Sequence, residues 1–274
     1  MKKWMIACLL LSVLTGCKKD IELDYQDLTE PLLVVEGHVS NEGMEVRVTR
    51  SVNMDQSVST QGIAVDQMVV TSDRGEQVEL HYDADGYYRA PEGVCGEAGH
   101  SYTLSLRQGS LTATCTSTML APTQVQRFSY EWINIMGREF FQLSAVIDEN
   151  PDEDNYYCWR MTRNGEAYRW NAVDDRGVAD EEMNIDVICM TRQQSDDDKE
   201  EDQERVIHDG DVMAIEVQCI DRQTYDYLYA LGLNTSSNSN PKSLFTVTGT
   251  EGGTVMGYFA AYSVARSKEL TVKL

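Results

Sequence analysis

The chain has 274 residues, of which 45 are acidic and 23 are basic, so its formal net charge at pH 7 is −22. A surface this acidic argues against nucleic acid as a partner, because phosphate contacts dominate such binding, and anionic lipid headgroups would repel it. Hydrophobic residues make up 42% of the sequence, which supports packed cores and excludes a disordered stalk.

A basic and then apolar segment stands at the start of the sequence. Lys2 and Lys3 precede an apolar run over residues 4–14 that only Ser12 interrupts. This run is too short to span a bilayer, which takes about 20 apolar residues, but it has the length of a secretory signal core. We therefore expect residues 1–16 to be a signal peptide.

The apolar run ends in Leu14-Thr15-Gly16-Cys17, which matches the bacterial lipobox of an aliphatic residue, two small residues and a cysteine. The small residues give a peptidase access to the bond before Cys17, whose thiol takes a diacylglyceryl group. Two or three acyl chains anchor a protein far more firmly than one, because each buried methylene contributes about 0.8 kcal/mol. We predict lipidation of Cys17 and an acidic tether over residues 17–30. The alternative is an ordinary signal peptide with a chance cysteine.

Five cysteines remain besides Cys8 in the leader and Cys17. They are Cys95, Cys115, Cys158, Cys189 and Cys219. The number is odd, so at least one is unpaired or pairs between chains, and the absence of a C-x-x-C spacing argues against structural zinc. Export would permit disulfides, but the spacings favour no pairing. We prefer buried free thiols.

From residue 31 the sequence has the short period of β-strands. Apolar and polar side chains alternate over residues 45–49 and again over residues 111–118, where threonines share one face. Turn signals such as Asp85-Gly86 separate these runs. Short strands at this spacing predict an immunoglobulin-like β-sandwich over residues 31–121.

A second β-rich domain is expected over residues 122–274, after a boundary at Ala121-Pro122-Thr123. One short helix interrupts its strands. Asp221 can cap the start of this helix, apolar residues over 225–229 have helical spacing, and Gly232 can end it in a left-handed conformation. The fold class that we expect for the whole chain is all-β with one short helix.

We find no catalytic motif and expect no enzyme. The sequence has no G-x-S-x-G elbow, H-E-x-x-H motif or P-loop, although a triad assembled from distant residues stays open. Asp83-Ala84-Asp85-Gly86 resembles part of a calcium loop, but the later ligands are missing, so a hairpin turn is favoured. The acidic run over residues 195–204 is typical of solvated chain and leaves weak cation binding open. We expect neither a bound metal nor a cofactor.

Aromatic residues give the best indication of a ligand site. Trp132, Trp159 and Trp170 all follow the expected boundary. Such rings stack on sugars and favour interfaces, but a β-domain also needs large side chains in its core. Trp159 alternates with apolar residues, which favours the core, whereas Trp170 stands in a polar stretch, which favours exposure. The candidate ligand-binding residues are Trp170, Trp159 and Tyr258.

Several stretches in a fixed order resemble a known family. They are Leu33–Gly37 after the lipobox, Asn155-Tyr156-Tyr157 after an acidic turn, a tyrosine-rich helix after Ile220-Asp221, and the closing stretch from Gly253 to Val264. Together they resemble the Bacteroidota envelope lipoproteins of a domain family of unknown function, DUF4249. The resemblance implies a two-part β-rich lipoprotein, often encoded beside TonB-dependent outer-membrane receptors, and it brings no catalytic residues.

The leader and the resemblance together imply a lipid-anchored protein of the outer membrane. Lys18-Lys19-Asp20-Ile21-Glu22 is similar to the signals that place such lipoproteins on the cell surface, while a periplasmic orientation stays open. We expect a non-enzymatic accessory to a TonB-dependent receptor that acts through partner contact or substrate capture. The alternatives are a glycan-binding lipoprotein that uses its C-terminal aromatics, and an adhesion or assembly module that uses strand edges.

Overall fold

A computed structural model describes residues 32–52, 62–191, 206–233, 241–249 and 254–274. The predicted leader, the predicted lipidation site Cys17, the tether and the acidic run over 195–204 lie outside these residues. In the part of the chain that is described, no helix is both long enough and apolar enough to cross a membrane. Residues Pro31–Leu274 form one compact unit.

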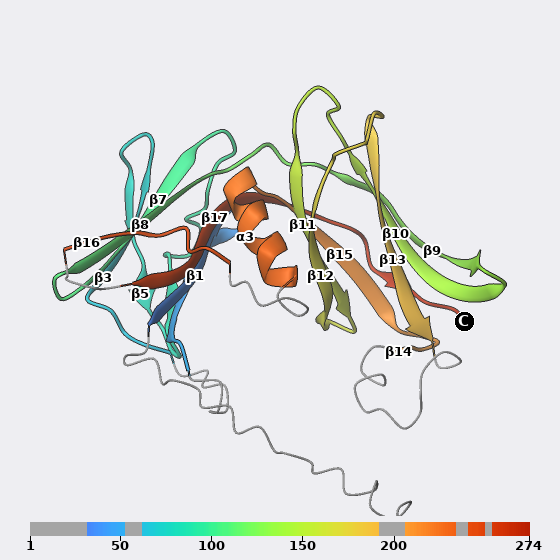
Figure 1. Cartoon of the computed structure of the whole chain (residues 1–274), viewed down its shortest axis with the longest axis horizontal. Helices are drawn as coiled ribbons and strands as arrows, with labels where there is room; N and C mark the ends of the chain where they lie inside the picture. The colour runs from blue at the N-terminus through green and yellow to red at the C-terminus, as the bar shows by residue number, and fades with distance from the viewer. Residues whose placement is uncertain (1–31, 53–61, 192–205, 234–240, 250–253) are drawn as a thin grey trace, which may run out of the picture. The chain divides into compact units, whose positions relative to one another are not determined.

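A nine-stranded sheet, counted over the described ranges, is the main element of this unit (Figure 1). All of its neighbouring strands are antiparallel except one parallel pair, β1 and β17. In spatial order the strands are β12 (Glu166–Asp174), β11 (Tyr156–Arg163), β15 (Val212–Cys219), β17 (Val255–Arg266), β1 (Leu33–Ser40), β2 (Gly43–Arg50), β6 (Tyr87–Arg89) and β5 (His81–Tyr82), with β18 (Leu270–Thr271) beside β15.

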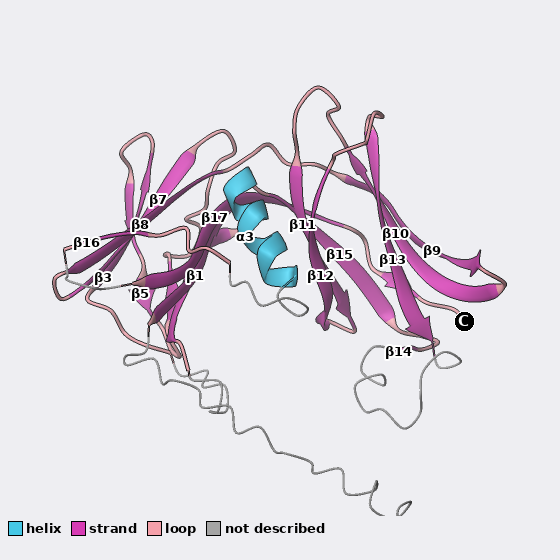
Figure 2. Ribbon diagram, viewed as in Figure 1, coloured by secondary structure: helices cyan, strands magenta, loops and turns pink. Residues whose placement is uncertain are grey.

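Two smaller sheets pack on one face of the large sheet (Figure 2). The first contains β16 (Thr246–Thr248), β8 (Leu111–Thr118), β7 (Ser101–Gln108), β3 (Gln67–Ser72) and β4 (Gln77–Glu79). The second contains β14 (Val206–Ile207), β13 (Glu182–Thr191), β10 (Arg138–Asp148) and β9 (Val125–Ile135). Each encloses an apolar core against the large sheet, the first around Phe259 and Leu104 and the second around Phe141 and Ile215. The predicted all-β, sandwich-like fold with a short helix is confirmed.

The chain crosses from the first sandwich to the second between β8 and β9, where the boundary was expected. The chain later returns to the first sandwich. Strand β16 pairs with β8, and residues 255–262 of β17 pair with the whole of β1. The predicted division into residues 31–121 and 122–274 does not account for this return, because alternation within a strand says nothing about which distant strand becomes its neighbour.

The parallel pair depends on glycine at position 257. Gly257 has a φ of +118°, and a Cβ atom there would lie 1.9 Å from the carbonyl oxygen of Val35. Any other residue would therefore meet both a backbone penalty and a direct clash. This glycine lets the last long strand lie close beside the first.

Helix α3 (Arg222–Leu233) packs on the other face of the large sheet, against β12, β11 and β17. The predicted cap is confirmed, because Asp221 Oδ1 accepts a hydrogen bond from the Thr224 N–H at 2.9 Å. The prediction that Gly232 ends the helix is wrong. Gly232 lies inside the helix, which continues to Leu233, and its backbone is not left-handed.

Local turn chemistry is as the sequence predicts. Asp85 and Gly86 have φ values of 49° and 81° and join β5 to β6, which is the two-residue hairpin that such a pair favours. Asp83 forms an ion pair with Arg89 of the same hairpin. The stretch from Asp83 to Gly86 is therefore a hairpin turn.

The cysteines that the structure describes are free thiols. The preference for buried free thiols is confirmed at four of the five positions, which are Cys115, Cys158, Cys189 and Cys219. Cys95 differs, because it lies in an exposed loop. Burial raises the pKa of the Cys158 thiol to about 11, so this group stays protonated at neutral pH.

Candidate functional site

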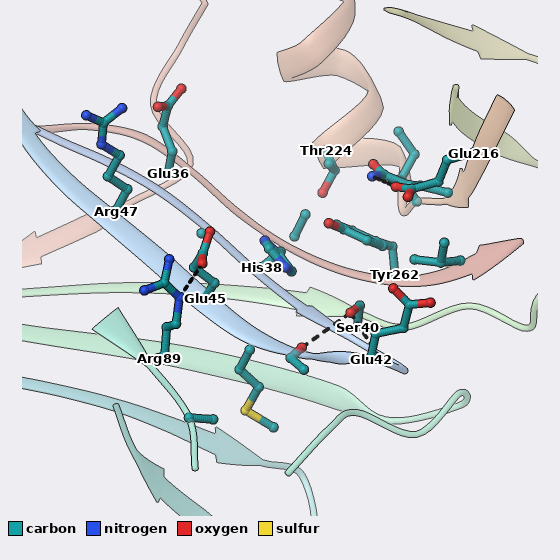
Figure 3. Close-up of a pocket in the computed structure, with 18 of the residues that line it drawn as sticks. Glu36, His38, Ser40, Glu42, Glu45, Arg47, Arg89, Glu216, Thr224 and Tyr262 are labelled. Carbon is teal, nitrogen blue, oxygen red and sulfur yellow. Dashed lines mark hydrogen bonds and ion pairs between the residues drawn. The ribbon is translucent and has the colours of Figure 1, made fainter. Parts of the chain in front are cut away.

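A groove of about 860 Å³ lies on the face of the large sheet that carries helix α3 (Figure 3). Side chains alternate between the two faces of a strand. Odd-numbered residues of β1 and β17, such as Val35 and Phe259, enter the first core. Even-numbered residues, such as His38 and Tyr262, therefore line the groove. The volume falls within the range of about 300–1,000 Å³ that small-molecule sites occupy.

Strand register arranges the groove side chains in rows. One row crosses four adjacent strands and consists of Trp170, Arg160, Glu216 and Arg266. A second row, on β17, β1, β2 and β6, consists of Tyr258, Glu36, Arg47 and Tyr87. Cross-strand neighbours have Cβ atoms about 5 Å apart, so aromatic, cationic and anionic groups alternate at short range. The sheet backbone fixes this order.

Ion pairs hold several of these charges in place. Arg266 bonds to both oxygens of Glu42, one of them at 2.7 Å, and its Nη2 lies 2.6 Å from Glu216. Arg89 lies 2.7 Å from Glu45. The hydrogen bond from Arg266 holds the pKa of Glu42 below its usual range. Half-exposed pairs of this kind contribute little to stability, but they set the positions of the side chains around the groove.

Other polar groups in the groove have no partner within the described part of the chain. The clearest is Thr224 on the first turn of helix α3, whose Oγ1 is fully buried and forms no hydrogen bond there. The hydroxyls of Tyr258 and Tyr262 and the ring nitrogens of His38 also form no hydrogen bond with a described residue, but they do not count among the buried unsatisfied groups as Thr224 does. Arg160 interacts with the Cys158 thiol, but no described carboxylate lies within ion-pair distance of it. We call Thr224, Tyr258, Tyr262, His38 and Arg160 the unpaired cluster.

The buried Thr224 hydroxyl is unusual in physical terms. More than nine in ten buried polar groups in proteins have a hydrogen-bond partner, and an unsatisfied buried hydroxyl costs about 1–3 kcal/mol. In Figure 3 the Thr224 hydroxyl points from the helix into the groove, where Tyr262 and His38 lie. Thr224 is the one member of the cluster that is a buried unsatisfied group among the described residues, while Arg160 is exposed and His38 and Tyr258 are half-buried. Together they offer hydrogen-bonding groups to a molecule that enters the groove.

Protonation leaves most of the cluster neutral. The rings of His38 and Tyr262 stack with centroids 5.3 Å apart. Burial lowers the pKa of His38, so this side chain is uncharged at neutral pH. Burial also raises the pKa of Tyr258 to about 12 and that of Tyr262 further. These groups can therefore donate and accept hydrogen bonds, and Arg160 supplies the cluster's one positive charge.

The groove also contains a serine, a histidine and a carboxylate, but they are not arranged for nucleophilic catalysis. The Ser40 hydroxyl donates to the Gly43 carbonyl at 3.3 Å and accepts from the Glu42 N–H at 3.2 Å, so the β1–β2 turn occupies it. His38 stacks on Tyr262 instead of bonding to Ser40. A general base must lie within hydrogen-bond reach of the proton that it removes. The geometry favours binding over bond cleavage.

The structure places two of the three candidate ligand residues on this groove. Trp170 is 42% exposed and lines it, as its polar surroundings predict, and Tyr258 lines it while packing on Tyr227 at 5.0 Å. Trp159 is 6% exposed and belongs to the second core. It points away from the groove because it is the neighbour of Arg160 along β11, on the opposite face. The predicted core position of Trp159 is confirmed.

Most of the unpaired cluster could not be found from the sequence. Thr224 is one of many polar residues, and Arg160 and His38 stand in ordinary alternating strands. The one local signal is the alternation of side chains along each strand, since the even-numbered polar residues of β1 face away from the core. Which strands share the face depends on the return of β17.

The profile of one sequence family matches nearly the whole chain. It is described as a domain of unknown function, DUF4249, and it matches residues 18–268. The chain belongs to the DUF4249 family. No curated protein matches this DUF4249 member.

Two solved structures show weak similarity to the DUF4249 chain. One is a two-domain fibronectin type III segment of chicken tenascin, with 15% identity and a TM-score of 0.22, covering 80% of this chain and 99% of that one. The other is the apo structure of β-glucuronidase 3 from Bacteroides uniformis, with 10% identity and a TM-score of 0.20. That alignment covers 81% of this chain but 25% of the enzyme, so this chain spans a quarter of its length.

Proposed function

We propose that this DUF4249 member is a non-enzymatic lipoprotein of the outer membrane that captures a small polar solute for a TonB-dependent receptor. The observation that carries the proposal is the unpaired cluster in a groove with the volume of a small-molecule site. Lipid on Cys17 would hold the protein at the membrane, which follows from the lipobox. The receptor follows from the family resemblance.

Capture suits this groove because its polar groups are held before a ligand arrives. Side chains on paired strands lose little freedom on binding, which lowers the cost of association. Helix α3 fixes Thr224 through the cap at Asp221. A preformed site with donors and acceptors in several directions favours a ligand that carries several polar groups.

The test is a binding screen with a matched pair of variants. The purified full chain would be titrated with monosaccharides, disaccharides, amino acids and dipeptides, with native mass spectrometry as the readout. We expect at least one class to bind, and the double variant Tyr262→Phe with Thr224→Val to lose most of that affinity. A control double variant, Tyr229→Phe with Thr103→Val, removes two hydroxyls outside the groove and should bind normally. Equal binding by both variants would place the ligand elsewhere.

The receptor part of the proposal needs a separate measurement. The full chain, captured from detergent-solubilised outer membranes, should bring a TonB-dependent receptor with it. Recovery of no receptor under conditions that keep the protein folded would count against this partner, while leaving solute capture to the binding screen.

A second candidate is a surface lipoprotein that binds polysaccharide through its aromatics, and the exposure of Trp170 at the groove favours it. Because Trp132 is also exposed while Trp159 is buried, Trp170→Ala is the informative change. Polysaccharide should shift the tryptophan fluorescence of the wild type and leave that of Trp170→Ala unchanged. A shift that survives this substitution would exclude Trp170 as the contact.

A further inference from the structure

Arg160 is an arginine of the groove that forms no ion pair with a described carboxylate. The same is true of Arg107, Arg163 and Arg169, but unlike them Arg160 lines the groove. The nearest candidate is Glu216, its cross-strand neighbour on β15, but the Glu216 carboxylate bonds to Arg266 at 2.6 Å. The Arg160 guanidinium instead lies near Cys158, Tyr258 and Tyr262 on the groove side. It offers planar, fixed donors that suit a carboxylate.

The surroundings of Arg160 are neutral and rich in hydroxyls. Tyr258, Tyr262 and Thr224 supply three hydroxyls that have no hydrogen-bond partner among the described residues. Trp170 is the cross-strand neighbour of Arg160 on β12 and exposes its indole. An aromatic face beside hydroxyl groups suits a ligand with an apolar ring face and polar substituents at its edge.

The charges farther along the groove limit the charge of the ligand. Five carboxylates, those of Glu36, Glu42, Glu45, Glu92 and Glu216, line the groove. At a separation of about 8 Å and an effective dielectric of 20, two like charges repel by about 2 kcal/mol. Arg266 and Arg89 offset three of these charges through their ion pairs with Glu42, Glu216 and Glu45. The repulsion on a second negative charge of the ligand therefore comes chiefly from Glu36 and Glu92, whereas a single negative charge can lie on Arg160.

We propose that the solute is an acidic sugar, whose one carboxylate binds Arg160 and whose ring lies against Trp170. This inference rests on the proposed function of solute capture. It adds to that function the class of ligand and the residue that selects it. A neutral sugar would leave the guanidinium without a carboxylate, and a phosphorylated sugar would bring a second negative charge into a groove that also contains Glu36 and Glu92.

The test compares two sugars that differ in one group. The full chain would be titrated with methyl α-D-galacturonide and with methyl α-D-galactoside, which carries a neutral CH₂OH in place of the carboxylate. We expect the acidic sugar to bind about tenfold more tightly, the usual effect of a charged hydrogen bond in a binding site. Arg160→Gln should remove this difference, because the affinity for the acidic sugar falls to about that for the neutral sugar. Arg107→Gln, an exposed position on β7, removes the same charge outside the groove and should preserve the difference.

The other outcomes separate the two proposals. Equal binding of both sugars, dependent on Tyr262 and Thr224, would overturn the acidic-sugar assignment and leave solute capture supported. Arg160-dependent preference for galactose 6-phosphate or for trialanine over the galacturonide would also overturn it, in favour of another anion. Binding of neither sugar would overturn it as well, and the wider binding screen would then decide whether the groove captures any solute.

Discussion

The imidazole of His38 stacks on the phenol of Tyr262, with an angle of 25° between the ring planes. The two residues belong to β1 and β17, which run parallel beside each other although one is the first and the other the last long strand that the structure describes. The groove is therefore built from both ends of the folded chain.

The His38 stack predicts a dependence of stability on pH. Burial lowers the pKa of His38 below its ordinary value of 6.5, so the unfolded chain binds the proton more readily than the native protein does. The stability that the buried, neutral His38 contributes is complete above pH 6.5. It is lost as the pH falls from 6.5 through the lowered pKa of the folded state, because the imidazole then becomes protonated. We expect the urea midpoint of the wild type to fall between pH 7.5 and pH 5.5 by more than that of His38→Gln.

The neighbours of His38 do not reverse this sign. Glu45, Glu42 and Glu216 raise its pKa while Arg160 lowers it, and burial outweighs them in the net direction. Titration of the histidine by NMR in the folded protein gives a direct check. An imidazole that titrates above 6.5 would contradict the prediction.

Replacing Thr224 by valine should preserve or raise stability but weaken ligand binding. Thr224→Val removes a buried hydroxyl that has no described partner and keeps nearly the same shape, so the free energy of unfolding should stay level or rise by up to about 1 kcal/mol. Ligand affinity should fall. Thr123→Val is the control, because Thr123 Oγ1 donates to the Asp148 carbonyl at 2.7 Å, and its loss should destabilise by about 1 kcal/mol. Chemical denaturation measures the free energy of unfolding of both variants. An equal loss of stability in Thr224→Val and Thr123→Val would show that the Thr224 hydroxyl has a hydrogen-bond partner in the protein.

Gly257→Ala should be among the most damaging single substitutions in the large sheet. The new methyl group would lie 1.9 Å from the Val35 carbonyl oxygen at a φ of +118°, which should cost about 3 kcal/mol or more. Gly93→Ala separates the two causes, since Gly93 has a φ of +81° with nothing within 4 Å of the added carbon. We expect about 1–2 kcal/mol there, from backbone strain alone. Similar losses at both positions, measured by thermal unfolding, would refute the close approach.

Lipidation is tested at Cys17. Cys17→Ala should leave a precursor that keeps its leader, because the lipobox peptidase acts on the lipidated cysteine. Mass spectrometry of the wild type should show a mature protein that begins at Cys17 with acyl chains attached. Normal cleavage and membrane retention of the alanine variant would contradict a lipid anchor at this position.

Local sequence patterns are enough to predict single strands and turns, whose structure depends on neighbouring residues. Val46 and Val48 alternate with polar residues and are fully buried in β2, and Asp85-Gly86 forms its expected hairpin. Strand β12 shows no clear alternation, because polar and apolar residues are mixed along it and only Ala172 is buried at this edge of the sheet. Gly232 was misread, since a helical glycine and a terminating one look alike in sequence.

The candidate site was predicted only in part, for a different reason. Trp170 and Tyr258 could be chosen by residue type and surroundings. Arg160 and Thr224 are of interest because Arg160 has no described carboxylate partner and Thr224 has no described hydrogen-bond partner. Such partners would come from strands far apart in the sequence, so their absence cannot be predicted locally. The residues of one strand show which of its faces is buried, but they do not show what lies across the other face.

The side-by-side placement of β1 and β17 also bears on how the protein reaches its destination. Until β17 has been delivered, β1 has only one neighbour and β15 presents an open edge, which are conditions that promote aggregation. Pairing that closes so long a stretch of chain is also slow. If the polypeptide is exported in an unfolded form, β1 cannot complete its pairing until β17 has also crossed the membrane. Shielding of these two strand edges until β17 arrives would then favour folding over aggregation.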